Sequence, residues 1–165
     1  MFSHLDEANQ PTMVDVGAKS PTRREAAAQA IVRLPPAVLA HFKDGDIASK
    51  KGPVFQTAIL AGIMACKKTS DLIPLCHPLA LDDCKVRIHL NDKREAVVEC
   101  RVACHQKTGV EMEALTGASI AALTLYDMCK ALSHDIVIAE VRLIEKTGGK
   151  SDVRSAASLI QDPAD

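Results

Sequence analysis

The sequence predicts an α+β fold in which helices pack on one face of an antiparallel sheet. Apolar and polar residues alternate over 84–90, as in a strand with one face toward the core. Two other segments, 54–67 and 108–133, are apolar nearly all round, as in buried helices. The predicted order is strand, helix, strand, strand, helix, strand, which is the split βαβ, or ferredoxin-like, arrangement.

Length and composition are typical of one globular domain. The chain has 165 residues, of which 47% are hydrophobic and 25% charged, enough to form a core without metal or disulfide support. The net charge is −1, so no positive field attracts nucleic acid or an anionic membrane. One Tyr, three Phe and no Trp leave few side chains for stacking on bases. We expect neither nucleic-acid nor membrane partners, and any phosphate must meet a local cluster of cations.

The two ends of the chain are more polar than its middle. Residues 1–12 are expected to form a flexible tail, and 153–165 a second tail with a weak helix at 156–160. Residues 13–152 are expected to form a single ferredoxin-like domain. No secretory signal is recognisable, and the six cysteines include no CxxC pair. The cysteines are therefore expected to be reduced thiols in a cytoplasmic protein.

The first half of the domain begins with a short predicted strand at 13–16. Segment 22–34 is ambiguous, because its alanines favour a helix whereas its alternating apolar positions favour a strand. A short helix is expected at 37–42. The next helix opens at 51 and runs to about 67, with Pro53 in its first turn.

The second half begins with a loop at 71–78 that contains two prolines. Two strands follow at 84–90 and 95–103, joined by a turn at 91–93.

The best-defined helix spans 108–133, and Thr108 with Glu111 has the T-x-x-E pattern of a capping box. A final strand is predicted at 136–144. One small sheet cannot cover a helix that is apolar on all sides, so we expect this helix to contact other subunits.

Carboxylates at both ends of this helix are candidates for chemistry. Asp127 and Lys130 are three residues apart and share a face, so they could form an acid–base pair, although the spacing alone favours a structural ion pair. Glu111 and Glu113 lie in the first turn, where acidic residues favour the helix dipole. Glu113 and Asp127 are separated by about 21 Å along a helix, too far to serve one small substrate from one chain.

The glycine-rich segment 148–151 has part of a phosphate-binding loop. Ile144 stands where a Walker A motif needs glycine, so the motif is absent. Exposed backbone N–H groups with Lys146 and Lys150 could still bind phosphate.

Cysteine and histidine residues could form a zinc site in two places, but neither has a standard ligand spacing, so no metal site is expected. His77 precedes Pro78, which restricts its backbone to extended conformations. The two groups are Cys76, His77 and Cys84, and Cys100, Cys104 and His105.

Five sequence segments closely resemble the cyclic pyranopterin monophosphate synthase family, also called molybdenum cofactor biosynthesis protein C. They are MVDVGAKSPTRREA, DLIPLCHPL, KTGVEMEALTGAS, AALTLYDMCKA and EKTGGKSD. The resemblance covers the chain from Met13 to about Asp152.

The resemblance implies a lyase with a ferredoxin-like fold, assembled as a homohexamer (a trimer of dimers) with active sites at subunit interfaces. Such an enzyme converts (8S)-3′,8-cyclo-7,8-dihydroguanosine 5′-triphosphate, a GTP-derived substrate, to cyclic pyranopterin monophosphate. This pterin product forms by acid–base catalysis with release of pyrophosphate. No cofactor is required, although Mg²⁺ can accompany the triphosphate.

The resemblance also implies roles for residues of this chain. We expect the two catalytic lysines at 51 and 146 to meet the pair Asp127–Lys130 in space. The implied catalytic residues are Asp127, Lys130, Lys51 and Lys146, and the implied substrate contacts are Leu75, Cys76, His77, Met112 and Glu113.

Three positions depart from the family pattern: Pro53 replaces Asp, 104–106 holds larger residues in an expected turn, and Asp152 replaces Gly. The alternatives to the synthase are a nucleotide- or metal-binding module on the same scaffold, and a zinc-dependent hydrolase. Intact catalytic residues favour the synthase over the binding module, and the absence of zinc-ligand spacing disfavours the hydrolase.

Overall fold

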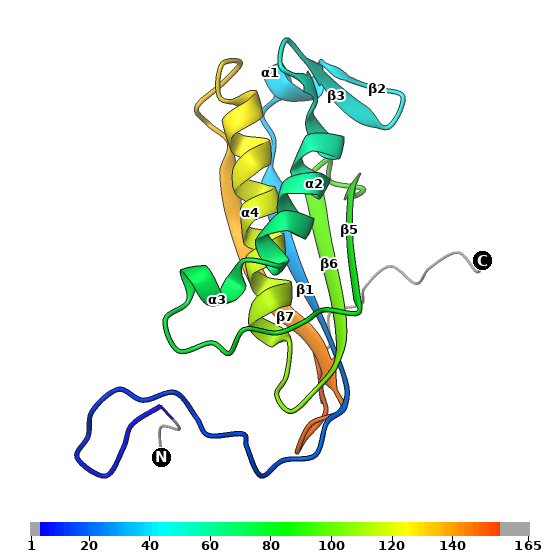
Figure 1. Ribbon diagram of the computed structural model, residues 1–165. Helices are drawn as coiled ribbons and strands as arrows, with labels where there is room; N and C mark the ends of the chain where they lie inside the picture. The colour runs from blue at the N-terminus through cyan, green and yellow to red at the C-terminus, as the bar shows by residue number, and fades with distance from the viewer. Residues whose placement is uncertain (1–3, 156–165) are drawn as a thin grey trace.

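Two long helices lie side by side across one face of an antiparallel sheet (Figure 1) in the computed structural model, which describes residues 4–155. The sheet order is β5-β6-β1-β7-β8, and every adjacent pair is antiparallel. One helix follows β1 and the other joins β6 to β7, so the predicted ferredoxin-like fold is confirmed. These elements are β1 (Thr22–Arg33), α2 (Val54–Cys66), β5 (Asp83–Leu90), β6 (Ala96–Gln106), α4 (Glu111–Cys129), β7 (Val137–Thr147) and β8 (Val153–Arg154).

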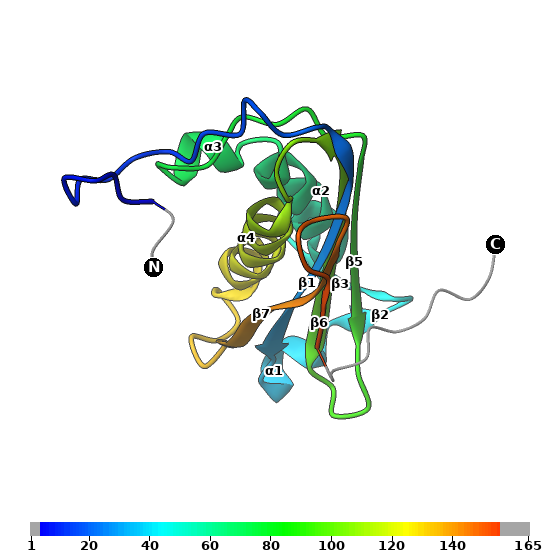
Figure 2. The same cartoon turned by 90° about the horizontal axis from the view of Figure 1, so that it is seen from below.

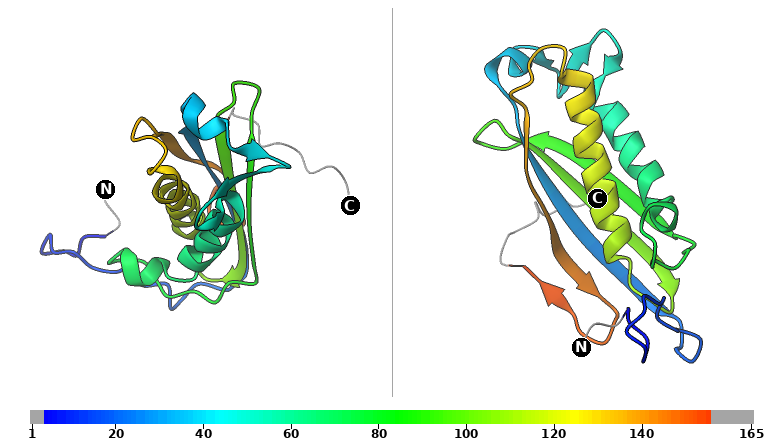
Figure 3. Two further views of the ribbon diagram at one scale, coloured as in Figure 1. Left: turned by 90° about the horizontal axis from the view of Figure 1, so that it is seen from above. Right: turned by 90° about the vertical axis from the view of Figure 1, so that its left-hand side faces the viewer.

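The ambiguous alanine-rich segment is the central strand β1. It pairs with β6 on one side and β7 on the other, so sheet hydrogen bonding decides against its helical propensity. Ala26, Ala28 and Ala30 belong to the core and are at most 3% exposed. Their small side chains let α4 lie close to the sheet. Figure 3 shows α4 lying over one face of the sheet.

Close helix packing depends on two glycines. A Cβ at Gly62 of α2 would lie 2.9 Å from the Gly117 carbonyl oxygen of α4, so a side chain there would force the helices apart. Both helices are therefore buried against each other as well as against the sheet.

The starts of both helices differ from the prediction. The capping box is wrong, because α4 begins at Glu111 after Val110 and has no side-chain cap. Pro53 is the N-cap residue of α2 and not a first-turn residue. Asp46 caps α2 instead: its carboxylate accepts backbone hydrogen bonds from Phe55 at 2.7 Å and Gln56 at 3.2 Å.

Smaller elements complete the fold. No strand forms at 13–16, and the predicted tail residues Val153 and Arg154 pair with β7. The weak helix predicted at 156–160 lies outside the described residues. No helix within residues 4–155 is long and apolar enough to cross a membrane. The remaining elements are α1 (Pro36–Leu39), β2 (Phe42–Lys43), β3 (Asp46–Ser49), β4 (Gly52–Pro53) and α3 (Thr69–Leu72), and β2, β3 and β4 form a second small sheet.

Candidate active site

Three of the predicted catalytic residues meet at the C-terminal end of α4. Lys130 Nζ lies 2.6 Å from Asp127 Oδ1, and Lys51 Nζ lies 3.3 Å from Asp127 Oδ2. The hydrogen bonds from Lys130 and Lys51 lower the pKa of Asp127, and Asp127 raises the pKa of Lys130. About half of each side chain is exposed. We call these three residues the exposed triad.

A tight turn between β3 and β4 places Lys51. Ser49 Oγ donates to the Gly52 carbonyl oxygen at 2.8 Å and accepts from the Lys51 N–H at 3.1 Å. Gly52 has φ +114°, a conformation that side chains rarely adopt. Asp46 begins β3 and caps α2, so Lys51 is held between two anchored elements.

All five predicted substrate contacts line one cavity of about 510 Å³ at the opposite, N-terminal end of α4. The irregular segment after α3 supplies three of them, and the first turn of α4 supplies the other two. Burial raises the pKa of Cys76, so this thiol is neutral. We call this space the Glu113 cavity; it is lined by Leu75, Cys76, His77, Met112 and Glu113, together with Lys19, Glu111 and Lys150 among others.

Glu113 differs from an ordinary first-turn carboxylate. It is 4% exposed, and burial raises its pKa to about 7. A carboxyl group with such a pKa can both give and take a proton near neutral pH. The sequence suggested only a helix-dipole role or a substrate contact for it, because depth of burial is not visible in the local pattern.

A second cavity of about 210 Å³ adjoins the first and is rich in cations. It shares Lys19, Glu111 and Lys150 with the Glu113 cavity. Lys146 Nζ lies 3.0 Å from Glu111 Oε1, and Glu111 supplies the one carboxylate among the described residues that line this second cavity. The sequence pointed to Lys146 and Lys150, whereas the other three were missed because they come from separate segments. The five cations are Lys19, Arg24, Lys107, Lys146 and Lys150.

Two hydrogen bonds hold the N-terminal segment against these cavities. His77 Nε2 donates to the Val14 carbonyl oxygen at 2.8 Å, and Lys107 Nζ donates to that of Gly17 at 2.7 Å. Figure 2 shows the segment lying beside the chain that follows α3. The rim of the cavity is thus built from residues far apart in sequence.

The three departures from the family pattern lie in defined positions. Asp152 Oδ1 accepts the Gly148 N–H at 3.1 Å and so closes the glycine turn beside the cations. Residues 104–106 end strand β6 and are not the expected turn. The helix cap that Pro53 cannot provide comes from Asp46. Of the three departures, Asp152 therefore has a defined structural contact.

The sequence predicts that Lys51 and Lys146 both lie beside Asp127 and Lys130. Within one chain, Lys51 lies there and Lys146 does not. Lys146 pairs with Glu111, which precedes Asp127 by 16 residues, or about 24 Å along the helix axis. The candidate residues therefore form two groups at opposite ends of α4.

The fold and the cavities define an α+β protein suited to a small phosphorylated ligand, with a carboxyl group ready for proton transfer beside it. The chain belongs to the MoaC family, whose model matches residues 13–149.

Named relatives agree with this assignment. The chain is 51% identical, over 94% of each chain, to a protein from Xanthomonas oryzae named cyclic pyranopterin monophosphate synthase. It is 52% identical to a protein of the same name from Heliobacterium modesticaldum, covering 91% of this chain and 94% of the relative. A molybdenum cofactor biosynthesis bifunctional protein from Synechocystis is 54% identical over 93% of this chain, which spans 45% of that longer protein.

Proposed function

We propose that this chain is a cyclic pyranopterin monophosphate synthase of molybdenum cofactor biosynthesis. It would convert (8S)-3′,8-cyclo-7,8-dihydroguanosine 5′-triphosphate to cyclic pyranopterin monophosphate and pyrophosphate. Full-length relatives at about half identity carry this name. The observation that carries the proposal is that all five expected substrate contacts line one cavity, and that this cavity adjoins five cations.

The cations are assigned to the triphosphate. Five positive side chains around Glu111 offset the charge of the phosphates and of the leaving pyrophosphate. Lys146, on β7, is assigned the phosphate nearest the reacting centre. The overall net charge of −1 gives no general attraction for anions, so this local cluster provides it.

Proton transfers are assigned to three groups. Remodelling the guanine-derived ring requires protons to leave and enter, and Glu113 can do both because its pKa is about 7. The other two groups are Lys130 and Asp127, which form an ion pair. Asp127 keeps Lys130 protonated until substrate replaces the solvent around them.

The active site is proposed to combine two subunits. About 21 Å separates Glu113 from Asp127 along α4, so the exposed triad of one copy must meet the Glu113 cavity of another to act on the same molecule. Large apolar side chains on the helical layer support such contacts: Leu60 is 59% exposed, Met64 55% and Leu123 54%. A symmetric dimer generates two such sites, and three dimers would form the hexamer.

The proposed setting follows from the chemistry. Six free cysteines support a cytoplasmic location. The reaction uses no resident cofactor, and Mg²⁺ would enter with the substrate triphosphate.

The test is to incubate the wild-type protein and Lys130→Ala with the cyclic dihydroguanosine triphosphate and to measure pyrophosphate and pterin together. Lys130 is half-exposed, so the variant should fold. We expect both products from wild type and neither from the variant. Tight substrate binding by an oligomeric wild type without either product would replace the synthase by a binding module. Equal product from both proteins would remove Lys130 from the chemistry.

A further inference from the structure

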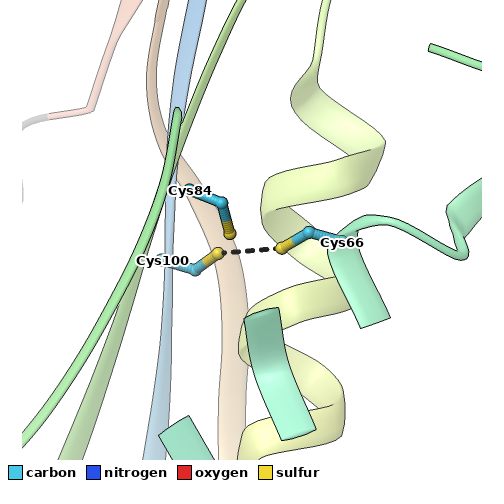
Figure 4. Close-up of side chains that lie close together, drawn as sticks. All are labelled: Cys66, Cys84 and Cys100. Carbon is cyan, nitrogen blue, oxygen red and sulfur yellow. Dashed lines mark hydrogen bonds between the residues drawn. The ribbon is translucent and has the colours of Figure 1, made fainter. Parts of the chain in front are cut away.

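Three cysteines from three separate elements converge beneath the edge of the sheet (Figure 4). Cys66 ends α2, Cys84 lies on the edge strand β5, and Cys100 lies on β6. The Sγ atoms of Cys66 and Cys100 are 3.5 Å apart, and all three sulfurs lie within 4.8 Å of one another. No function was assigned to them above, and neither cysteine–histidine group that the sequence suggested contains all three.

A glycine of α4 makes room for this cluster. A Cβ at Gly117 would lie 2.4 Å from Cys66 Sγ and 2.6 Å from Cys100 Sγ, closer than atoms can approach. Cys66 and Cys100 are 2% and 0% exposed, whereas Cys84 is partly open to solvent. The three sulfurs therefore lie in the core, and the partly exposed Cys84 provides a route by which an ion could enter from solvent.

The sulfur triangle has the size of a metal site. An ion in the plane of three sulfurs with Zn–S bonds of about 2.3 Å needs sulfurs about 4.0 Å apart. The Cys66 and Cys100 sulfurs are 3.5 Å apart and no pair is more than 4.8 Å apart, so the triangle is close to that size. Changes of less than about 1 Å in these separations would complete the site.

Thiolates, and not thiols, are the forms that ligate a metal ion. Binding would therefore release the thiol protons of the three cysteines to solvent, with no change in oxidation state.

We propose that Cys66, Cys84 and Cys100 bind one thiophilic metal ion of the Zn²⁺ and Cu⁺ class. Soft thiolates select these ions over Mg²⁺ and Ca²⁺, which prefer oxygen ligands. Among residues 4–155 this is the group whose cysteine, histidine or carboxylate ligand atoms lie close enough to share an ion. The ion would join the end of α2 to the sheet edge, a few residues before the loop that lines the Glu113 cavity. It would be separate from the proposed reaction.

The experiment titrates reduced, metal-free, full-length protein with Cd²⁺ under anaerobic conditions. The readouts are the sulfur-to-cadmium charge-transfer absorption, the metal content by native mass spectrometry and the melting temperature. We expect one Cd²⁺ per chain and a melting temperature that rises with Cd²⁺. A parallel titration with Cu⁺, followed by native mass spectrometry, should likewise give one ion per chain.

Cys84→Ser is the informative variant because this residue is partly exposed and the substitution nearly preserves its shape. We expect it to weaken Cd²⁺ binding at least about tenfold, the cost of losing even an outer contact of a metal site. Cys104→Ser is the control, a buried cysteine outside the cluster on β6, the strand that carries Cys100, and should still bind one ion. Absence of charge-transfer absorption in folded wild type, or equal binding by Cys84→Ser, would overturn the proposal.

Discussion

The two ends of α4 place carboxylates in opposite environments. At its N-terminal end Glu113 is 4% exposed, and burial raises its pKa to about 7. At its C-terminal end Asp127 is about half-exposed, and hydrogen bonds from Lys130 and Lys51 lower its pKa. Burial within its own chain therefore raises the pKa of Glu113, whereas Asp127 is a solvated anion between two ammonium groups.

The contrast supports the proposal that another surface must cover the C-terminal end of α4 before the exposed triad can act. A solvated ion pair adds little to stability and has no low-dielectric surroundings to assist chemistry. The exposed triad would gain such surroundings only when another surface covers it. The triad and the cation cluster both carry net positive charge, so an anionic substrate between them would favour their approach.

Replacing the buried carboxyl group should have the largest effect. Glu113→Gln removes the proton-transfer group while keeping its shape, so we expect kcat to fall by about 10² to 10⁴. Steady-state kinetics across pH 5 to 9 checks this, and the limb of the pH profile near 7 should disappear with the group. An unchanged limb would mean that another residue titrates there.

The same substitution should change stability in a pH-dependent way. The folded-state pKa of about 7 lies above the ordinary value of 4.5, so the folded protein binds more protons than the unfolded chain between these values. Wild-type stability should therefore fall as pH rises from 4.5 to 7. Relative to wild type, Glu113→Gln should gain on the order of 1 to 3 kcal/mol between pH 4.5 and pH 8, measured by urea unfolding. A pH-independent difference would contradict the buried-carboxyl account.

The cation cluster should control substrate binding. Lys146→Ala removes one phosphate contact and one charge that offsets the leaving pyrophosphate, so we expect KM to rise about tenfold and kcat to fall as well. Glu111→Gln is the matched control because it breaks the same ion pair but leaves the lysine in place. If both variants raised KM equally, the ion pair and not the lysine charge would be responsible.

The smallest expected effect concerns the anchor of Lys51. Asp46→Ala removes the carboxylate that caps α2, which should lower the free energy of unfolding by about 1 kcal/mol. Urea unfolding measures this loss. Asp44→Asn is the control, because it removes a neighbouring charge while suiting the left-handed backbone at that position. Equal losses in both variants would argue against the cap.

The sequence predicted the fold because the strand pair 84–90 and 95–103 and the two apolar helices have clear periodicity. It left β1 undecided, since alanine favours a helix locally and only pairing with β6 and β7 decides. It placed the start of α4 wrongly because Glu111 pairs with Lys146 rather than capping.

The sequence predicted the site only in part, because local patterns do not show which distant segments the fold brings together. Motif strings pointed to residues close together in sequence, such as Asp127 with Lys130. Lys19, Arg24 and Lys107 join Lys146 only through the fold, and no local pattern connects them. The pKa of Glu113 likewise depends on what buries it.

The central claim, that the two ends of α4 form one site across two subunits, is tested most directly by mixing two inactive variants. Glu113→Gln and Lys130→Ala are each assayed alone and then after dissociation and reassociation together. If each site takes Glu113 from one subunit and Lys130 from its neighbour, random mixing restores about a quarter of the wild-type activity, since one site in four has both intact residues. Activity no higher than the average of the two variants would contradict a shared site.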